Sequence, residues 1–298
     1  MRKLAAIGLA LTLATGLAAC SSSSKPASSN TTPTTKPTAT TSACGNATIP
    51  AAAKTFKPKI ADTLSVVTSL PGPGFWEGSD TDPTKVTSGY EYDIAKCMEE
   101  AFGLHTMKVR NVSFDAIVAG TITNYDLALS QISITAARAK VVSFSTPYFE
   151  SQQGVLMRKG DTMSTLAQAK AAKWGVQTGT TAIDLLSKIG ATKQHTYQSL
   201  ADAYTALQAK QVDAILIDTA INLGEAARSN GSFHVVAQFN QPGGPDHYGA
   251  ILPKGSTNVA SVDAVFKALT DSGELKTLAA KDLTADPGTI PVIKVPAS

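Results

Sequence analysis

The chain has 298 residues, of which 43% are hydrophobic and 16% charged, so it can bury a large core in one or two domains. It carries 26 basic and 23 acidic residues. We expect Arg2 and Lys3 to be removed, which leaves 24 − 23, or a charge of +1. This near balance gives no reason to expect binding to nucleic acid or to an anionic surface.

Residues 1–19 have the pattern of a secretory signal peptide, in which two basic residues precede an apolar stretch and small residues follow. The apolar stretch is too short for a permanent membrane span. Leu17-Ala-Ala-Cys20 resembles the lipobox of bacterial lipoproteins. This resemblance implies that Cys20 is lipidated and anchors the protein at the outer face of the cytoplasmic membrane. A buried cysteine is the alternative.

Residues 20–43 consist almost entirely of Ser, Thr, Pro, Ala and Lys after the cysteine, a composition that predicts a disordered tether. Cys44 and Cys97 follow, in a compartment that we expect to be oxidising. They can form one disulfide or remain two buried free thiols, and the sequence leaves both possibilities open.

From residue 64 onward, short β-branched runs alternate with amphipathic patterns, which predicts α/β units and mostly parallel sheets. The expected strands are 64–68, 107–110, 127–129, 154–157, 174–177, 213–217, 233–237 and 248–252. The expected helices are 93–102, 113–118, 166–172, 182–189, 199–210, 219–229, 259–272 and 274–281. Ser113 and Ser199 are typical helix caps, and Gly103 is a typical helix stop.

Two flexible crossings divide these elements into two lobes, with the second lobe inserted in the first. The crossings are expected at residues 148–152 and 243–247 and act as a hinge. The first lobe would contain residues 44–147 and 248–298, and the second lobe residues 153–242.

One candidate binding element is the end of the apolar strand at 127–129, where Ser130 and Ser133 place hydroxyls at a sheet edge. Ligands bind at such edges in open α/β folds. Arg138, in the following turn, offers a planar fork of donors that matches a carboxylate. The alternative for Arg138 is an ordinary surface ion pair.

Three further elements could reach the same cleft. Thr180 and Thr181 begin a predicted helix, where unpaired N–H groups favour an anion, although both could be simple caps. Asp218 ends an apolar strand and could bind a cation or cap the next helix. Phe114 and the Phe75-Trp76 pair would supply aromatic walls, although Phe114 also fits a helix's core face.

An α-amino acid needs a carboxylate site and an ammonium site a few ångströms apart. Arg138 with the N–H and hydroxyl of Thr181 would bind the carboxylate. Asp218, the Ser133 hydroxyl and main-chain carbonyls near Ser130 and Gln131 would bind the ammonium. Because these groups come from different lobes, the ligand would favour closure of the cleft.

The segment from Ser130 to Arg138, Ser-Gln-Ile-Ser-Ile-Thr-Ala-Ala-Arg, followed by Phe-Ser-Thr-Pro-Tyr at 144–148, resembles the ligand motif of the family 3 solute-binding proteins. These are the polar amino-acid-binding proteins of ABC importers. The resemblance extends from residue 64 to about 281. It implies the type II fold of periplasmic binding proteins, in which a two-strand hinge joins two α/β lobes around a ligand cleft.

The resemblance also implies roles for single residues, which we name at their positions in this chain. The clamp serine and arginine of the family fall on Ser133 and Arg138, and its Gly-Thr-Thr falls on 179–181. Its ammonium-binding aspartate falls on Asp218 and its pocket aromatic on Phe114.

Two departures from the family pattern bear on specificity. Thr68-Ser69 stands where the family usually has Thr-Asp, and Pro-Gly-Pro-Gly at 71–74 replaces an aromatic stacker, a role that Phe75 or Trp76 would take over. The missing acid removes the usual counter-charge for lysine, arginine or histidine. A neutral polar or acidic ligand such as glutamine or glutamate is therefore favoured.

The sequence thus predicts a monomeric binding protein that captures a polar amino acid and delivers it to an ABC permease, without cofactor, metal or catalysis. The histidines 105, 195, 234 and 247 have no ligand-like spacing. One alternative is a sensor subunit that reports to a signalling system. Another is a cyclohexadienyl-dehydratase-like enzyme on the same fold, for which Asp218 and His247 are the candidate acid–base groups.

Overall fold

The computed structural model describes residues 42–241, 243–285 and 288–296. The predicted signal peptide, Cys20 and nearly all of the predicted tether lie outside the described residues. No helix among the described residues is long and apolar enough to cross a membrane.

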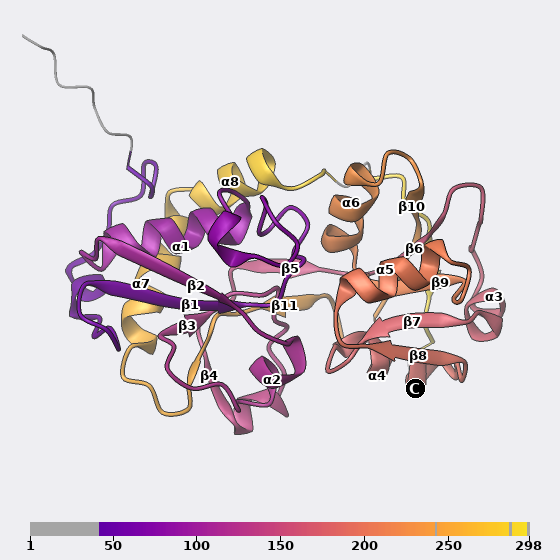
Figure 1. The fold of residues 1–298 in the computed structure, drawn as a ribbon, viewed down its shortest axis with the longest axis horizontal. Helices are drawn as coiled ribbons and strands as arrows, with labels where there is room; N and C mark the ends of the chain where they lie inside the picture. Colours follow the sequence, from indigo (N-terminus) through magenta and orange to yellow (C-terminus); the bar gives the residue numbers. More distant parts are fainter. Residues whose placement is uncertain (1–41, 242, 286–287, 297–298) are drawn as a thin grey trace, which may run out of the picture. The chain divides into compact units, whose positions relative to one another are not determined.

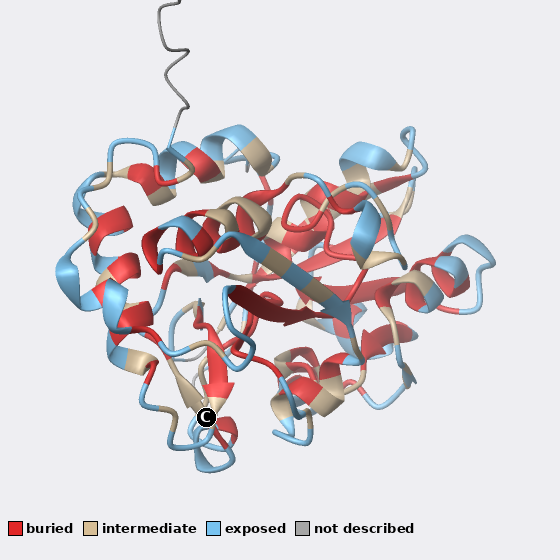
Figure 2. Cartoon of the chain, turned by 60° about the vertical axis from the view of Figure 1, so that its left-hand side comes forward, coloured by how far each residue is buried: buried red, intermediate tan, exposed pale blue. Residues whose placement is uncertain are grey.

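The first lobe is built on a five-stranded sheet with the strand order β2-β1-β3-β12-β4 (Figure 1). Its strands are β1 (Thr63–Thr68), β2 (Thr106–Asn111), β3 (Leu127–Ala128), β4 (Val142–Phe144) and β12 (Ile251–Pro253). Its helices are α1 (Tyr90–Ala101), α2 (Phe114–Val118), α7 (Val259–Asp271) and α8 (Glu274–Asp282), with short 3₁₀ turns at η1 (Ala51–Thr55), η2 (Pro83–Lys85) and η3 (Arg138–Lys140). Every residue of the inner strand β1 is buried, whereas those of the edge strand β2 are exposed or half-buried (Figure 2). Burial along the whole length is typical of a strand covered on both faces.

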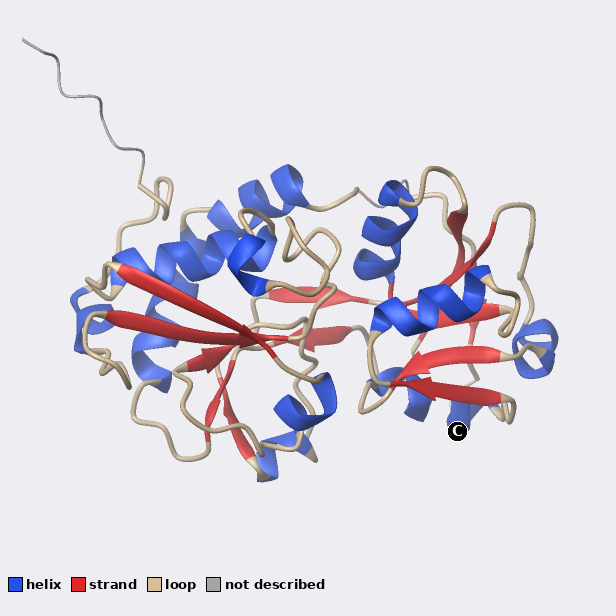
Figure 3. Ribbon diagram, in the orientation of Figure 1, coloured by secondary structure: helices blue, strands red, loops and turns tan. Residues whose placement is uncertain are grey.

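The second lobe is built on a six-stranded sheet with the strand order β13-β10-β6-β9-β7-β8. Its strands are β6 (Gln153–Arg158), β7 (Trp174–Gln177), β8 (Gln194–Tyr197), β9 (Ala214–Asp218), β10 (Phe233–Asn240) and β13 (Val292–Lys294). Its helices are α3 (Leu166–Ala171), α4 (Thr181–Ile189), α5 (Leu200–Gln208) and α6 (Thr219–Arg228). Of these, α4, α5 and α6 lie against the sheet, and α3 lies at its far end next to α4 (Figure 3). The central strand β9 is buried along its whole length, as its apolar sequence predicts.

Two short strands lie where the chain passes between the sheets. The strands β5 (Phe149–Ser151) and β11 (Asp246–Tyr248) pair antiparallel with each other and with no other described strand. The expected hinge segments, 148–152 and 243–247, overlap these two strands.

The sheets are mixed, whereas the sequence predicted mostly parallel ones. The pairings among β1, β2 and β3 and among β7, β8 and β9 are parallel, as expected. The strands β6 and β12, which directly follow the two crossings, run antiparallel to their partners. No crossover helix precedes either of them, and such a helix is what normally keeps successive strands parallel.

The C-terminal segment corrects the expected lobe boundary. Residues 248–298 were all expected in the first lobe, but β13 pairs in parallel with β10 of the second sheet. Ile293 is buried there in the same apolar cluster as Phe239. A strand of three residues gives too short a pattern to be predicted from the sequence.

The three residues predicted to mark helix ends do lie at helix ends, with one difference in capping. The Ser199 hydroxyl accepts a hydrogen bond from the N–H of Asp202 at the start of α5. Gly103, with a φ of 73°, directly follows Phe102, the C-cap residue of α1. Ser113 lies at the N-cap of α2, but its side chain makes no capping hydrogen bond.

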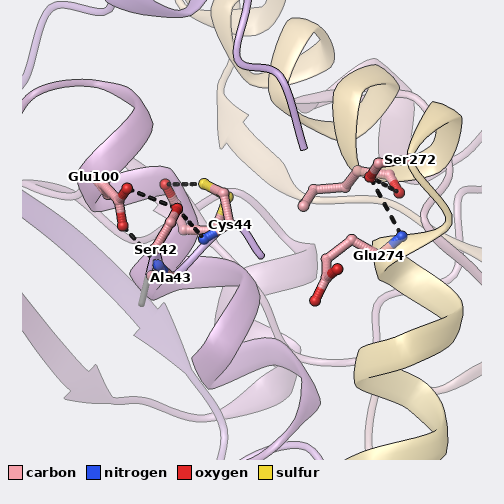
Figure 4. Close-up of a disulfide and its surroundings, with 8 residues drawn as sticks. Ser42, Ala43, Cys44, Glu100, Ser272 and Glu274 are labelled. Carbon is pink, nitrogen blue, oxygen red and sulfur yellow. Dashed lines mark hydrogen bonds between the residues drawn. A yellow bond between two sulfur atoms is a disulfide. The ribbon is translucent and has the colours of Figure 1, made fainter. Parts of the chain in front are cut away.

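A disulfide joins Cys44 to Cys97 of α1, with their Cα atoms 4.6 Å apart (Figure 4). The Glu100 carboxylate reinforces this attachment by accepting hydrogen bonds from the Ser42 hydroxyl (2.8 Å) and the Ala43 N–H (2.7 Å). The first described residues are therefore fastened to α1.

We expect the paired replacement Cys44→Ser/Cys97→Ser to lower the free energy of unfolding by about 2–4 kcal/mol, because the disulfide restricts the unfolded chain over a long loop. Urea unfolding monitored by circular dichroism would measure this loss. Ligand affinity should not change, because neither cysteine lines the cavity described below. An unchanged unfolding midpoint would contradict the bond.

Candidate functional site

A cavity between the two lobes brings together most of the residues expected from the sequence. Its lining includes eight of them, namely Phe114, Ser130, Gln131, Ser133, Arg138, Thr180, Thr181 and Asp218. Of the other six, the sequence named Ser69 and Pro71 only as departures from the family pattern, and it did not single out Gln177, Leu200, Ile217 and Ile221. The lining comes from both sheets, so a ligand there would contact both lobes.

Arg138 is a buried residue of the cavity and not a surface ion-pair partner, since its exposed fraction is 8%. Its guanidinium donates hydrogen bonds to the carbonyl of Ser133 (2.6 Å) in its own lobe and to that of Gly179 (2.9 Å) in the other. The Cζ atom lies 5.4 Å from the centre of the Phe114 ring, a cation–π geometry. Two fixed carbonyls and one ring thus set the plane of the guanidinium.

Burial lowers the pKa of Arg138, and the nearby carboxylates, Asp218 first among them, oppose this shift. An arginine has a pKa so high that it stays protonated in such a site. Arg138 therefore places a permanent positive charge in the cavity.

The N-terminus of α4 reaches the cavity without a side-chain cap. The Thr180 hydroxyl donates instead to the carbonyl of Gln177 (2.7 Å). The first N–H groups of a helix have no partner within the helix, so they can bind an anion. The Thr181 hydroxyl, however, donates to Asp246 (3.2 Å) and accepts from Gln153 (3.2 Å). The first N–H groups of α4 therefore remain available to a ligand carboxylate. The Thr181 hydroxyl was expected to bind the same carboxylate, but it donates its hydrogen to Asp246 instead.

Asp218 lies at the carboxyl end of β9, at the N-cap of α6, but its side chain makes no capping hydrogen bond. Its Oδ1 accepts instead from the Gln153 amide (3.2 Å), which also donates to Asp246 (2.8 Å). Burial raises the pKa of Asp218 well above its usual range, and the Asp246 carboxylate raises it further. A cation beside Asp218 would oppose both effects, so the residue is suited to bind an ammonium group.

The serines fix the backbone on the first-lobe side of the cavity. The Ser130 hydroxyl accepts a hydrogen bond from the N–H of Ser69 (3.0 Å), which ties the end of β3 to the end of β1. Ser133 forms an isolated antiparallel bridge with Tyr248, next to the crossing. Both serines are buried and line the cavity.

Phe75 and Trp76 do not line the cavity, contrary to the expectation that one of them supplies an aromatic wall. Both are buried in the core of the first lobe. Phe75 packs edge-on against the rings of Tyr90 and Phe149, and the Trp76 indole donates to Glu91 (2.7 Å). The stacking role assigned to this pair was therefore wrong, and Pro71 and Phe114 are the ring-bearing residues in the described lining.

These features form a site with a cation, a helix N-terminus and a carboxylate around one small cavity. Residues 78–284 match the model of the bacterial extracellular solute-binding proteins, family 3. The chain belongs to this family.

Several curated proteins resemble this solute-binding protein. They include the ABC transporter arginine-binding protein 1 of Escherichia coli, which is 30% identical over 135 residues, or 45% of this chain and 55% of that protein. The L-cystine-binding protein TcyJ of E. coli is 26% identical over 211 residues (69% and 77%), and the glutamine-binding protein GlnH of Bacillus subtilis is 28% identical over 216 residues (67% and 74%). The match thus spans about half the length of the first relative and about three quarters of the other two.

Solved structures share the type II fold of the solute-binding protein. A mutant of ArgBP from T. maritima has a TM-score of 0.64 at 26% identity, over 74% of this chain and 95% of that one. An ancestral arginine-binding protein bound to glutamine has a TM-score of 0.64 at 26% identity, over 75% and 98%. The expected fold, two α/β lobes around a cleft, is therefore confirmed.

The solute-binding protein also brings its lobes together outside the cavity. Gly224 of α6 packs against the loop after β1 so closely that a Cβ atom there would lie 2.8 Å from the carbonyl oxygen of Pro73. Arg228, one helical turn further, forms an ion pair with Asp80 (2.6 Å). These contacts join the second lobe to the first, and they can form only when the two lobes are closed together.

We expect Gly224→Ala to weaken ligand binding by about 1–3 kcal/mol, the usual cost of overpacking, because the added methyl group would separate the lobes. Alanine also favours a helix over glycine by about 1 kcal/mol, so α6 itself should not be destabilised. Calorimetric titration with the ligand found in the screen proposed below would measure the affinity, and small-angle scattering would measure closure. Ala227→Gly, on an exposed position of the same helix, is the control and should leave affinity unchanged. Full ligand-induced compaction of Gly224→Ala would contradict this role.

Proposed function

We propose that this solute-binding protein captures a polar α-amino acid outside the cytoplasm and delivers it to an ABC permease. The observation that carries the proposal is that Arg138 and Asp218, which come from different sheets, line one cavity together with the N-terminus of α4. The relatives named above are arginine-, cystine- and glutamine-binding proteins, two of them named as ABC transporter proteins.

In this proposal the ligand's α-carboxylate binds to the free donors of Arg138 and to the first N–H groups of α4. A guanidinium has five N–H donors, and two of those of Arg138 are directed at protein carbonyls. The α-ammonium binds to Asp218, with the Ser133 hydroxyl and nearby main-chain carbonyls as additional acceptors. Because the ligand's two charges would contact groups of both lobes, binding energy is gained only when the lobes close.

We further propose that the protein performs no chemistry. His247, the other candidate acid–base group, has a side chain that is about half exposed, with its Nδ1 atom 3.3 Å from Oε1 of Glu150, and it does not line the cavity. Asp218 would then be the one carboxylate of the described lining, and the Gln153 amide lies between it and the neighbouring Asp246. A lipid anchor at Cys20 and a monomeric state complete the proposal.

A thermal-shift screen of the protein against the twenty amino acids and a set of simple carboxylates tests the proposal. A ligand that binds only the folded state raises the melting temperature by mass action. We expect a clear shift with one or two polar amino acids, and recovery of the ligand unchanged. No shift with any amino acid would overturn the proposal, and chemical conversion of the ligand would favour the enzyme alternative. Loss of uptake on deletion would separate a transporter subunit from a sensor.

A further inference from the structure

Glu91, in the first turn of α1, is a fully buried carboxylate that lies directly behind the cavity. Its Oε2 accepts hydrogen bonds from the Trp76 indole (2.7 Å) and from the Gln131 side-chain amide (2.6 Å). Its Oε1 accepts from the Gln131 main-chain N–H (2.8 Å) and from the Tyr148 hydroxyl. Burial raises the pKa of Glu91, and these donors oppose the shift. The indole N–H and the Gln131 main-chain N–H can only donate, so each oxygen of Glu91 acts as an acceptor.

These bonds determine which end of the Gln131 amide is available to a ligand. The amide nitrogen is directed at Glu91, and the main-chain N–H bond holds Gln131 at a φ of 51°, an uncommon value for a residue other than glycine. Gln131 is 6% exposed and lines the cavity, yet its Oε1 has no hydrogen-bond partner among the described residues. Gln131 therefore presents an unpaired carbonyl oxygen as an acceptor.

Gln177 provides a second acceptor from the opposite lobe. It ends β7, is 4% exposed and lines the same cavity. Its amide nitrogen donates to the main-chain carbonyl of Gln198 (3.3 Å), and a carbonyl can only accept, so the orientation of the amide is fixed. Its Oε1 also lacks a hydrogen-bond partner within the described part of the chain.

We infer that Gln131 and Gln177 form the side-chain subsite of the cavity, with Glu91 as the residue that positions Gln131. The subsite selects an amino acid whose side chain ends in neutral N–H donors, such as the amide of glutamine, over one that ends in a carboxylate. This inference rests on the proposed amino-acid binding function and goes further by naming the class of side chain.

The selection follows from the hydrogen-bonding capacity of the two amide oxygens. A ligand amide can donate to both of them, whereas a carboxylate has no N–H and would place its oxygens against unpaired buried oxygens. A cationic side chain would meet neutral acceptors only, because the charges of the described lining, Arg138 and Asp218, are already matched by the ligand's own α-carboxylate and α-ammonium. Glutamine therefore fits better than glutamate, arginine or lysine.

Calorimetric titration of the full chain with glutamine, glutamate and arginine tests the inference. We expect glutamine to bind at least about 100-fold more tightly than either of the others. Glutamate lacks the N–H group that the subsite is built to bond, and the charge of arginine would be buried against neutral acceptors. Gln131→Met and Gln177→Met keep the side-chain length and remove one acceptor each. Each should lower the glutamine-to-glutamate affinity ratio at least about tenfold. Glu91→Gln, which frees the Gln131 amide to turn over, should lower the same ratio.

The ratio separates a positioning role from a general loss of structure, because destabilisation alone would weaken both ligands alike. Glu99→Gln is the matched control, since Glu99 is a buried carboxylate of the same helix that does not line the cavity, and it should leave the ratio unchanged. The two methionine variants retain Glu91, so they still test the roles of Gln131 and Gln177 if Glu91→Gln fails to fold. Glutamate or arginine binding as tightly as glutamine, or an unchanged ratio in both methionine variants, would overturn the inference while amino-acid binding still stood. Binding of no amino acid would instead overturn the proposed function.

Discussion

Replacing Arg138 with alanine is expected to weaken amino-acid binding by about 2–5 kcal/mol, or about 30- to 4,000-fold, the usual cost of truncating one partner of a buried charge pair. Without the guanidinium, the ligand carboxylate would keep only the N–H groups of α4. The lobes would also lose the hydrogen bond to the Gly179 carbonyl. Calorimetric titration with the ligand identified by the thermal-shift screen would measure the loss.

One further variant separates the charge of Arg138 from its planar geometry, and another serves as a control. Arg138→Lys keeps the positive charge but not the planar fork, so its affinity should lie between those of wild type and Arg138→Ala. Arg110→Ala removes an exposed arginine of β2 that likewise donates to a main-chain carbonyl, that of Thr123 (2.8 Å), and it should bind normally. Near-wild-type affinity of Arg138→Ala would show that Arg138 does not contact the ligand.

The parts of the site that follow an apolar strand could be predicted from the sequence, because such strands are easy to recognise and their carboxyl ends meet at one edge of the sheet. Asp218 follows the buried strand β9, and Ser130 follows β3. Gln177 ends β7 in the same way, so this signal could also have found it. What the strand pattern did not provide was the pairing of residues across the lobes, which came from the family resemblance.

The direction of side chains in the loop after β1 could not be predicted in this way. The N–H groups of Phe75 and Trp76 both donate to the carbonyl of Gly72 (2.9 and 2.8 Å). In this turn the side chains of Phe75 and Trp76 point into the core of the first lobe and not toward the cavity. A loop rich in Gly and Pro has no periodic pattern from which the direction of its side chains could be predicted.

Gln153 and Asp246 were missed because they lie beside and within the two crossings, which the sequence identified only as flexible connections. The pairing of β5 with β11 places Asp246 opposite Ser151, two residues before Gln153. That pairing joins segments nearly a hundred residues apart, and no local pattern predicts it. The acidic network around Asp218 thus depends on tertiary structure, although each of its members is an ordinary polar residue in the sequence.

Asp218→Asn is expected to weaken binding of the amino acid by about 2–5 kcal/mol, because the α-ammonium would lose its charged partner in a buried site. A carboxylate of the same shape without the α-amine should bind to this variant at least as well as to wild type, since Asp218 offers it nothing but repulsion. Titration of both ligands into both proteins measures the difference. An equal loss for the two ligands would show that Asp218 has only a structural role.

The pH dependence of stability gives an independent check on the same residue. The folded protein holds the pKa of Asp218 well above the unfolded value, so the unfolded chain loses this proton first as pH rises. Its contribution to stability is therefore fully present below the unfolded pKa, near 3.9, and is lost as pH rises through the folded pKa. Asp218→Asn should remove this loss and melt at a higher temperature than wild type at neutral pH without ligand. Asp213→Asn, at the opposite end of β9, should not do so, because Asp213 accepts a hydrogen bond from the Lys173 N–H (2.8 Å) and lies outside the cavity. Higher stability combined with lost affinity is what a carboxylate kept for ligand binding predicts, whereas lower stability would mark Asp218 as a residue that the fold itself needs.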